Sequence, residues 1–379
     1  MIPFNKASFG GNELKYLALA IEQGHTSGNG PFTQQAEALL AKMHGGSATL
    51  LTTSCTHALE LAGRLLNLQA GDEVIVPSYT FVSTASAFLW NGAIPVFADI
   101  RPDTLNIDPE SVEARITDRT KAICIVHYAG VGAEPGRLAD IARRHGLTLI
   151  EDNAHGLGAT YAGQSLGTFG SLSTLSFHET KNLTCGEGGA LVINDADLVE
   201  RAEVLREKGT DRSRYVRGQV DKYTWVDAGS SWVMSDLLAA VLVGQLERFD
   251  EIQERRQAIW DRYYQELSEW ASANGVGLPV IPVEAQHSAH MFYLRLPSLE
   301  ARDRLIEHMR RRNVLTVFHY QSLRSSPQGL TVGMGREECP ISEVTSEKVV
   351  RLPLFFDLSY LEQSMVIDSV LQFSVKSAR

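Results

Sequence analysis

The sequence predicts an α/β protein built on a mainly parallel sheet, and two observations support this prediction. First, short continuous apolar runs recur between residues 48 and 193, which is typical of strands covered on both faces. Second, helical stretches lie between most of these runs, giving a repeated order of strand, loop and helix. In an open sheet of this kind, ligands bind at the carboxyl ends of the strands.

An arm and two helices are expected before the sheet. Residues 1–31 predict an arm with a helix at Asn12–Ile21, and Phe32–His44 predicts a second helix. The predicted strands are Ala48–Leu51, Glu73–Val76, Pro95–Ala98, Ala122–Val126, Leu147–Ile150, Leu172–Phe177 and Ala190–Ile193. The helices predicted between them are Thr56–Leu66, Phe81–Asn91, Pro109–Arg115 and Arg137–His145.

The second half of the chain predicts a smaller domain. The segments that lead into it are predicted to be a charged surface helix at Asp197–Lys208, a polar loop at Asp211–Tyr223 and one long helix from Met234 to about Glu269. Such a helix commonly crosses between lobes, so residues 1–249 are expected to form the arm and large domain and residues 250–379 the small domain. Further elements are predicted there: strands Met291–Leu296 and Leu315–Phe318, and helix Leu299–Arg311.

Composition excludes several classes of protein. The 379 residues carry a net charge of −10, which argues against a nucleic-acid or acidic-membrane partner. The chain has no apolar stretch near the ~18 residues that span a bilayer, and its first residues do not resemble a signal peptide. The cysteines form no CxxC pair, so no metal site or disulfide framework is predicted, and reduced thiols fit a cytoplasmic protein: Cys55, Cys124, Cys185 and Cys339.

One lysine and one aspartate follow two of the predicted strands. Asp152 ends the run Leu147–Ile150, and Lys181 lies in the polar turn after Leu172–Phe177. If these strands are parallel neighbours, both side chains stand at the same end of the sheet. Pyridoxal phosphate needs this pair, because a lysine holds its aldehyde as a Schiff base and a carboxylate keeps its pyridine nitrogen protonated. A loop lysine is more often merely solvated, and an aspartate at a strand end can also cap a helix or bind a metal.

Three further features could complete such a site. The polar stretch Thr52–Thr56 opens a helix, so its hydroxyls and free N–H groups could bind a phosphate, with Ser176 as another donor, although ordinary N-capping explains the same residues. His155 could reach the cofactor's phenolic oxygen or could be a satisfied loop histidine. The aromatic segment Pro77–Phe81 could cover a planar ring or could belong to the core.

Together these motifs resemble the DegT/DnrJ/EryC1/StrS family of sugar-nucleotide aminotransferases. The resemblance covers essentially the whole chain and rests on Thr53–Thr56, Pro77–Phe81, Glu151–His155 and Ser176–Asn182. It extends to Arg206–Thr210, Gly218–Trp225, His290–Tyr293, Phe318–Tyr320 and Arg351–Phe355. It implies a fold-type I pyridoxal phosphate enzyme with a large domain and a smaller C-terminal α+β domain.

The resemblance also implies roles for individual residues. Lys181 matches the lysine that holds the cofactor, Asp152 the carboxylate on its pyridine nitrogen, and His155 the residue near its phenolic oxygen. Ser54, Cys55 and Thr56 match the loop that binds the cofactor's phosphate, and Ser176 matches the serine of the same phosphate site. Phe81 matches the aromatic residue that stacks on the cofactor ring. Family members are dimers with active sites at the subunit interface, so a homodimer or a multiple of one is expected.

One segment departs from the family pattern. Many members have an asparagine, offered to the phosphate by the neighbouring subunit, and an arginine before a Met-Ser/Thr-Asp motif. Here Ser231 replaces the asparagine and Val233 the arginine, ahead of Met234-Ser235-Asp236. A serine hydroxyl could still make the contact across the interface.

The implied reaction transfers an amino group from L-glutamate to C4 of dTDP-4-keto-6-deoxy-D-glucose, giving an amine of the galacto configuration and 2-oxoglutarate. A related sugar-nucleotide aminotransferase acting at C3, or giving the gluco configuration, remains an alternative, as does a cofactor-binding homologue without activity. Dehydratase relatives replace the lysine with histidine, and Lys181 argues against that class. The sequence fixes neither the position nor the configuration of the new amine, nor the glycan that receives the sugar.

Overall fold

A seven-stranded sheet lies at the centre of residues 48–193 in the computed structural model, which describes residues 1–332 and 338–375. The strand order is β1-β9-β8-β5-β4-β2-β3. The strands are β1 (Ala48–Thr52), β2 (Glu73–Pro77), β3 (Ile94–Ala98), β4 (Thr120–Val126), β5 (Thr148–Asp152), β8 (Leu172–Ser176) and β9 (Gly189–Ile193). Only β9 runs against its neighbours β8 and β1, so the mainly parallel α/β sheet predicted from the sequence is confirmed.

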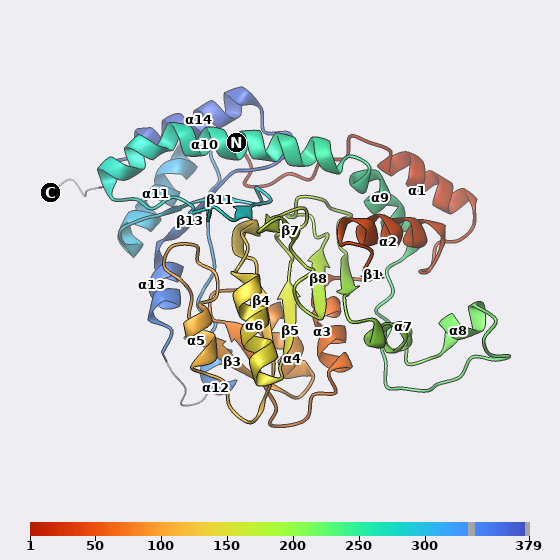
Figure 1. The fold of residues 1–379 in the computed structure, drawn as a ribbon. Coiled ribbons are helices and arrows are strands. Elements are labelled where there is room, and N and C mark those ends of the chain that lie inside the picture. The colour runs from red at the N-terminus through yellow and green to blue at the C-terminus, as the bar shows by residue number, and fades with distance from the viewer. Residues whose placement is uncertain (333–337, 376–379) are drawn as a thin grey trace.

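Helices cover both faces of this sheet (Figure 1). Successive residues of β4 point to opposite sides: Cys124 packs with one hydrophobic cluster and Ile125 with another. The first face is covered by α3 (Cys55–Leu65), α4 (Ser83–Trp90) and α7 (Val199–Arg206), and the second by α5 (Pro109–Glu113) and α6 (Pro135–His145). Burial on both sides explains why these strands read as continuous apolar runs.

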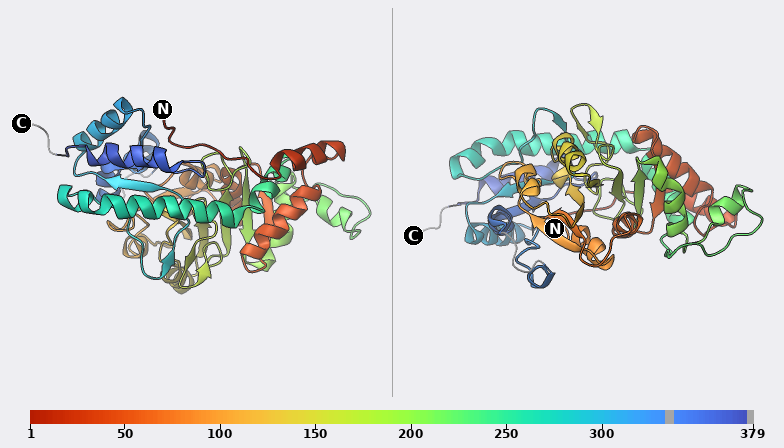
Figure 2. Two further views of the ribbon diagram at one scale, coloured as in Figure 1. Left: turned by 90° about the horizontal axis from the view of Figure 1, so that it is seen from above. Right: turned by 60° about the horizontal axis from the view of Figure 1, so that its bottom comes forward.

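The helices at either end of the chain lie at opposite ends of the molecule (Figure 2). Near β1, a third cluster joins the sheet to α1 (Glu13–Glu22), α2 (Pro31–Met43) and α9 (Asp236–Leu246). Beside these, the short helix α8 (Arg212–Val216) projects outward in Figure 1. The sequence predicted only a polar loop there, and that prediction missed this helix because five exposed or half-exposed residues carry no apolar period.

The C-terminal part contains its own small sheet. Its order is β11 (Phe292–Arg295), β13 (Val349–Leu352) and β12 (Val317–Phe318), all antiparallel. The surrounding helices are α10 (Phe249–Asn274), α11 (Leu299–Arg311), α12 (Pro327–Val332), α13 (Pro340–Lys348) and α14 (Tyr360–Leu371). One hydrophobic cluster unites this sheet with α10, α11 and α14. The division at residues 249 and 250 remains a prediction.

Two expectations about helices need correction. The long helix predicted from Met234 is two helices, since the backbone leaves helical geometry at Arg248 between α9 and α10. No glycine or proline marks the break; instead the Phe249 ring packs against Gly158, where a Cβ would lie 2.2 Å from it. The charged helix α7 is also less superficial than expected, because Ala202, Val204 and Leu205 are buried.

The remaining short elements are a three-stranded sheet and two 3-10 turns. They are β6 (Thr160–Tyr161), β7 (Gln164–Ser165), β10 (Ala285–Gln286), η1 (Tyr128–Gly130) and η2 (Ala196–Leu198). Across the described ranges, no helix has the length and apolarity that a bilayer crossing requires.

Candidate active site

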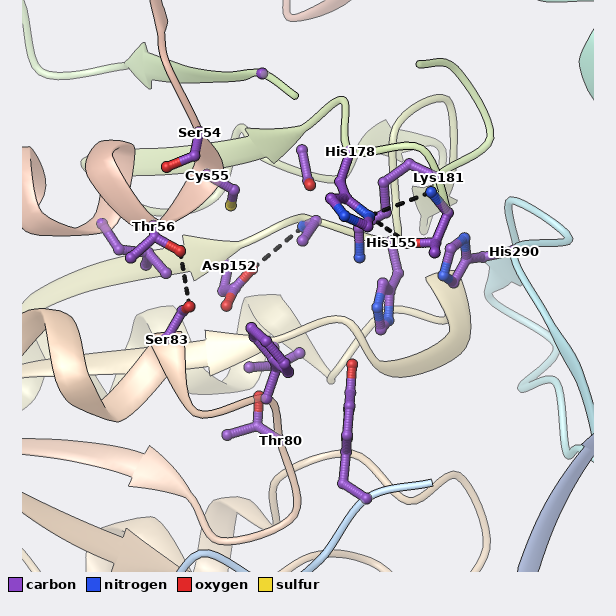
Figure 3. Close-up of a pocket in the computed structure, with 18 of the residues that line it drawn as sticks. Ser54, Cys55, Thr56, Thr80, Ser83, Asp152, His155, His178, Lys181 and His290 are labelled. Carbon is purple, nitrogen blue, oxygen red and sulfur yellow. Dashed lines mark hydrogen bonds between the residues drawn. The ribbon is translucent and has the colours of Figure 1, made fainter. Parts of the chain in front are cut away.

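A cavity of about 490 Å³ opens at the carboxyl ends of β5 and β8. These strands are parallel neighbours, which is the condition on which the prediction from the sequence depended, and Asp152 lies opposite Thr174. Figure 3 shows the result: Ser54, Cys55 and Thr56 lie on one side of the cavity, Lys181 and His155 on the other, and Asp152 between them. Residues separated by more than a hundred positions therefore share one cavity, at the end of the sheet where ligands are expected.

Asp152 is buried at the floor of the cavity. Its Oδ2 accepts a hydrogen bond of 2.7 Å from Thr84 Oγ1, and its Oδ1 accepts one from the backbone of Ala154. Burial raises the pKa of the Asp152 carboxyl, while the Thr84 hydroxyl and the Lys181 charge oppose the rise. A cation placed against this carboxyl would be held strongly, because the carboxyl is buried and solvent screens it little.

Lys181 lies on the turn after β8. Its backbone N–H donates to the carbonyl of His178, and the neighbouring Asn182 donates to the carbonyl of Ser288. Burial lowers the pKa of Lys181 to about 8, with Asp152 acting in the opposite direction. An amine with this pKa is partly neutral near pH 7 to 8, so it can attack a carbonyl and carry protons.

The N-terminus of α3 forms the opposite wall. Ser54 is its N-cap and accepts from the His57 N–H at 3.1 Å, so the capping role is present. The N–H groups of Cys55 and Thr56 have no acceptor among the described residues and remain available to an anion. Gly189 of β9 allows the close approach, since a Cβ there would lie 2.3 Å from the Ser54 carbonyl carbon. Ser176 at the end of β8 also lines the cavity.

The ionised form of the Cys55 thiol is disfavoured in this setting. Burial raises its pKa to about 12, and the charge of Asp152 adds to the rise. Its Sγ lies 3.5 Å from the hydroxyl of Thr174. Cys55 therefore contributes its backbone N–H and a small neutral side chain to the wall.

His155 presents an unpaired buried nitrogen. Its ring stacks on His290 at 4.2 Å between centroids, and its Nδ1 has no hydrogen-bond partner among the described residues. Burial lowers the pKa of His155 well below its usual value, and the charge of Lys181 adds to this, so the ring is neutral. Such a nitrogen is satisfied when a ligand group occupies the cavity.

Phe81 lines the cavity and is exposed, with its ring 6.0 Å from that of Tyr320. It is therefore not a core aromatic. Ser231, in contrast, is exposed and is not one of the lining residues of this chain. Its contact with the phosphate site of a second subunit remains a prediction.

These groups fit pyridoxal phosphate. The α3 terminus offers two free N–H groups to a phosphate, Asp152 offers a buried carboxylate to a pyridine nitrogen, and Lys181 offers a reactive amine. The orphaned Nδ1 of His155 supplies a further polar contact. Within the described ranges, no group of three metal-binding side chains gathers.

Several lining residues were not assigned a role from the sequence. His290, His319, Tyr320 and Arg351 come from the C-terminal part and close the cavity over Asp152 and Lys181. All four lie in stretches that resemble the family, and this resemblance is the sequence feature that could have identified them as site residues. Thr84, the partner of Asp152, carried no sequence signal because a threonine near the start of a helix is ordinary.

Fold and site together define a pyridoxal phosphate-dependent aminotransferase. The sequence profile of the DegT/DnrJ/EryC1/StrS aminotransferase family matches residues 8–371. The chain belongs to this family, as predicted, and is a transferase of amino groups.

Solved structures of similar proteins agree in fold over nearly the whole chain. The aminotransferase TlmJ from Streptoalloteichus hindustanus is 31% identical, with 98% of each chain covered and a TM-score of 0.89. DesV from S. venezuelae, solved with a ketimine intermediate, is 32% identical, with 97% of this chain and 95% of that chain covered and a TM-score of 0.88. The PMP form of the putative sugar aminotransferase Spr1654 from Streptococcus pneumoniae is 27% identical, with 97% and 98% covered and a TM-score of 0.90.

Proposed function

We propose that this enzyme transfers the amino group of L-glutamate to C4 of dTDP-4-keto-6-deoxy-D-glucose, giving dTDP-4-amino-4,6-dideoxy-D-galactose and 2-oxoglutarate. The observation that carries the aminotransferase part is the convergence of Lys181 and Asp152 in one cavity. A sugar acceptor is supported by the similarity to the putative sugar aminotransferase Spr1654.

The sugar itself is proposed from the sequence. The whole chain resembles transaminases that make dTDP-4-amino-4,6-dideoxygalactose, including Gly218–Trp225, which lies outside the cofactor motifs. That stretch adjoins α8 and exposes Tyr223 and Trp225. Exposed aromatics on a loop suit contact with a nucleotide or with a second subunit. We propose a homodimer in which Ser231 of one subunit serves the phosphate site of the other.

The bound cofactor supplies an electron sink in both halves of the reaction. In this proposal Lys181 holds the cofactor and then moves a proton to and from the substrate carbon. Asp152 keeps a proton on the pyridine nitrogen, and the N–H groups of Cys55 and Thr56 hold the phosphate with Ser54 and Ser176. Phe81 and His155 fix the plane of the ring. All four cysteines are free in the structure, which supports a reducing, cytoplasmic setting.

The experiment is a coupled assay of the purified enzyme with L-glutamate and a panel of dTDP- and UDP-linked keto sugars. Each product is analysed by NMR to locate the amine and its configuration. The proposal expects turnover of dTDP-4-keto-6-deoxy-D-glucose with an axial amine at C4. An equatorial C4 amine, or an amine at C3, contradicts the sugar assignment and leaves the aminotransferase chemistry in place.

A further inference from the structure

Two histidine rings stack against each other on the Lys181 side of the cavity. His155 follows β5, and His290 lies in the segment before β11. The ring centroids are 4.2 Å apart, the ring planes differ by 17°, and both side chains are buried. Figure 3 shows both rings near Lys181. His290 therefore covers one face of the His155 ring, whose Nδ1 has no hydrogen-bond partner among the described residues.

A hydrogen bond from the turn that carries Lys181 fixes the His290 ring. Asn182 Nδ2 lies 2.7 Å from the carbonyl oxygen of Ser288, which can only accept, so the NH2 group of the amide must face this carbonyl. The amide oxygen of Asn182 then faces His290 Nδ1 at 2.8 Å, and it too can only accept. The His290 ring is therefore protonated on Nδ1, which sets both its tautomer and its rotation.

The backbone beside the two rings is held by hydrogen bonds from other elements. Arg256 of α10 donates from Nη2 to the carbonyl oxygen of His290 at 2.7 Å, and the hydroxyl of Ser288 donates to the carbonyl oxygen of His155. Gly130 leaves room for the second contact, since a Cβ there would clash with Ser288 Oγ. The stacked pair therefore has little freedom to rotate or to separate.

The surroundings of the pair keep both rings neutral. Burial lowers the pKa of His155 and that of His290 well below the usual value. The charged groups that add to this effect are all cations: Lys181 and Arg351 at both rings, and Arg256 at His290. The other titratable rings around His155 are those of Tyr128 and His319, with centroids at 6.3 and 6.4 Å. Two neutral imidazole rings can stack without charge repulsion.

We propose that His290, fixed by Asn182, is a positioning residue that holds the His155 ring in the plane where it meets the cofactor. This inference rests on the place of His155 beside the cofactor's phenolic oxygen in the proposed function. A neutral histidine there can donate one hydrogen bond to that oxygen, and the strength of the bond depends on the angle of the ring. His290 acts through His155 and not on the oxygen itself.

The test follows the visible absorbance of the holoenzyme as a function of pH. The midpoint of this titration reports the proton on the nitrogen that joins Lys181 to the cofactor. A hydrogen bond donated to the phenolic oxygen stabilises its negative charge and lowers the midpoint, because the oxygen then holds the neighbouring proton less strongly. The variants are His155→Ala, His290→Ala, His290→Phe, Asn182→Ala, and His290→Ala and Asn182→Ala each combined with His155→Ala. His308→Ala is the matched control, because this histidine ring packs on Phe373 and is not among the cavity's described lining residues.

For His155→Ala we expect the midpoint to rise by about one pH unit, the size of a hydrogen bond to a charged oxygen. His290→Ala and Asn182→Ala should each raise it by about half a unit. In the His155→Ala background neither should cause a further rise, because the residue through which they act is gone. His290→Phe keeps a stacking ring and should shift the midpoint less than His290→Ala does. His308→Ala should leave it unchanged.

A measurement on the cofactor-free protein checks the hydrogen bond between Asn182 and His290. Nitrogen NMR of protein labelled at its histidines should show the Nδ1–H tautomer for His290, with the signal assigned from its loss in His290→Phe. Asn182→Ala removes the acceptor and should allow the other tautomer to appear. The Nε2–H tautomer in the unaltered protein would overturn the proposal.

Two results in the holoenzyme would also overturn it: an unchanged midpoint in His290→Ala, or a shift that persists in the His155→Ala background. If His290→Ala does not fold, Asn182→Ala decides by the same two criteria. An unchanged midpoint in His155→Ala would refute the contact of His155 with the phenolic oxygen, and this inference with it. A shift in His155→Ala with none in His290→Ala would refute this inference alone.

Discussion

The hydroxyl of Thr84 donates a 2.7 Å hydrogen bond to the buried Oδ2 of Asp152. Thr84 in turn is paired with Thr80 at 2.9 Å, so a short chain of hydroxyls ends at the carboxylate. The bond lowers the pKa of Asp152 against the effect of burial. Thr84 is therefore placed to fix the orientation of Asp152 and to favour its charged form.

Replacing Thr84 with valine keeps the shape and removes the hydrogen bond. We expect kcat to fall about 10-fold, because the carboxylate loses a charge-assisted partner that favours ionisation. The acidic limb of the pH–rate profile should move to higher pH, since the pKa of Asp152 rises without the hydroxyl. Thr84→Ser is the control and should retain both properties. An unchanged acidic limb in the valine variant would contradict this role.

Asp152→Asn tests the electron sink itself. An amide cannot keep a pyridine nitrogen protonated, so we expect kcat to fall by on the order of 10³-fold while cofactor still binds. Single-turnover kinetics with L-glutamate and the absorbance of bound cofactor measure the two effects separately. Turnover within a few-fold of the unaltered enzyme would remove Asp152 from the chemistry.

The adjacent Glu151 is expected to be structural. It is fully buried, contacts His127 Nε2 at 2.9 Å and accepts the N–H groups of Gly167, Phe169 and Gly170. Glu151→Gln should lower the free energy of unfolding by about 3 kcal/mol, because the NH2 group of glutamine cannot accept hydrogen bonds from the backbone N–H groups that Glu151 accepts. Urea denaturation measures this, and an exposed substitution such as Glu266→Gln is the control.

Glu151 also predicts a dependence of stability on pH. Burial raises its pKa, but the hydrogen bonds and charge of His127 and the backbone N–H groups outweigh burial, so the net pKa lies below 4.5. Its contribution is therefore present above pH 4.5 and is lost as the pH falls through the lowered value. Glu151→Gln should flatten this part of the stability profile. A profile identical to that of the unaltered protein would show that other carboxylates control acid unfolding.

Much of the site could be predicted from the sequence because it follows strand ends. Asp152 and Lys181 follow apolar runs that pair in parallel, so the register brings them together. Arg351 and His290 could not be assigned in this way, because they reach the cavity from the C-terminal part. Their position depends on antiparallel pairing of β11 with β13, and β13 was not predicted. The break at Arg248 also had no local signal, because no glycine or proline marks it.

Lys181 should titrate well below an ordinary lysine. Burial lowers its pKa from 10.5 to about 8 in the protein without cofactor, so the neutral amine is present above pH 8. The rate of cofactor attachment to the cofactor-free protein should therefore rise with pH to a midpoint near 8. Asp152→Asn removes a charge that raises this pKa and should move the midpoint lower. A midpoint near 10.5 would contradict the burial of the amine.

Lys181 is expected to be the residue that carries the cofactor, and borohydride reduction tests this role most directly. Borohydride reduces the carbon–nitrogen double bond between a lysine and the cofactor's aldehyde, and peptide mapping by mass spectrometry then locates the adduct. Lys181→Ala should give no adduct and should lose turnover by several orders of magnitude. We expect one modified peptide, and it should contain Lys181. An adduct on any other lysine, or no adduct in the yellow holoenzyme, would contradict this role.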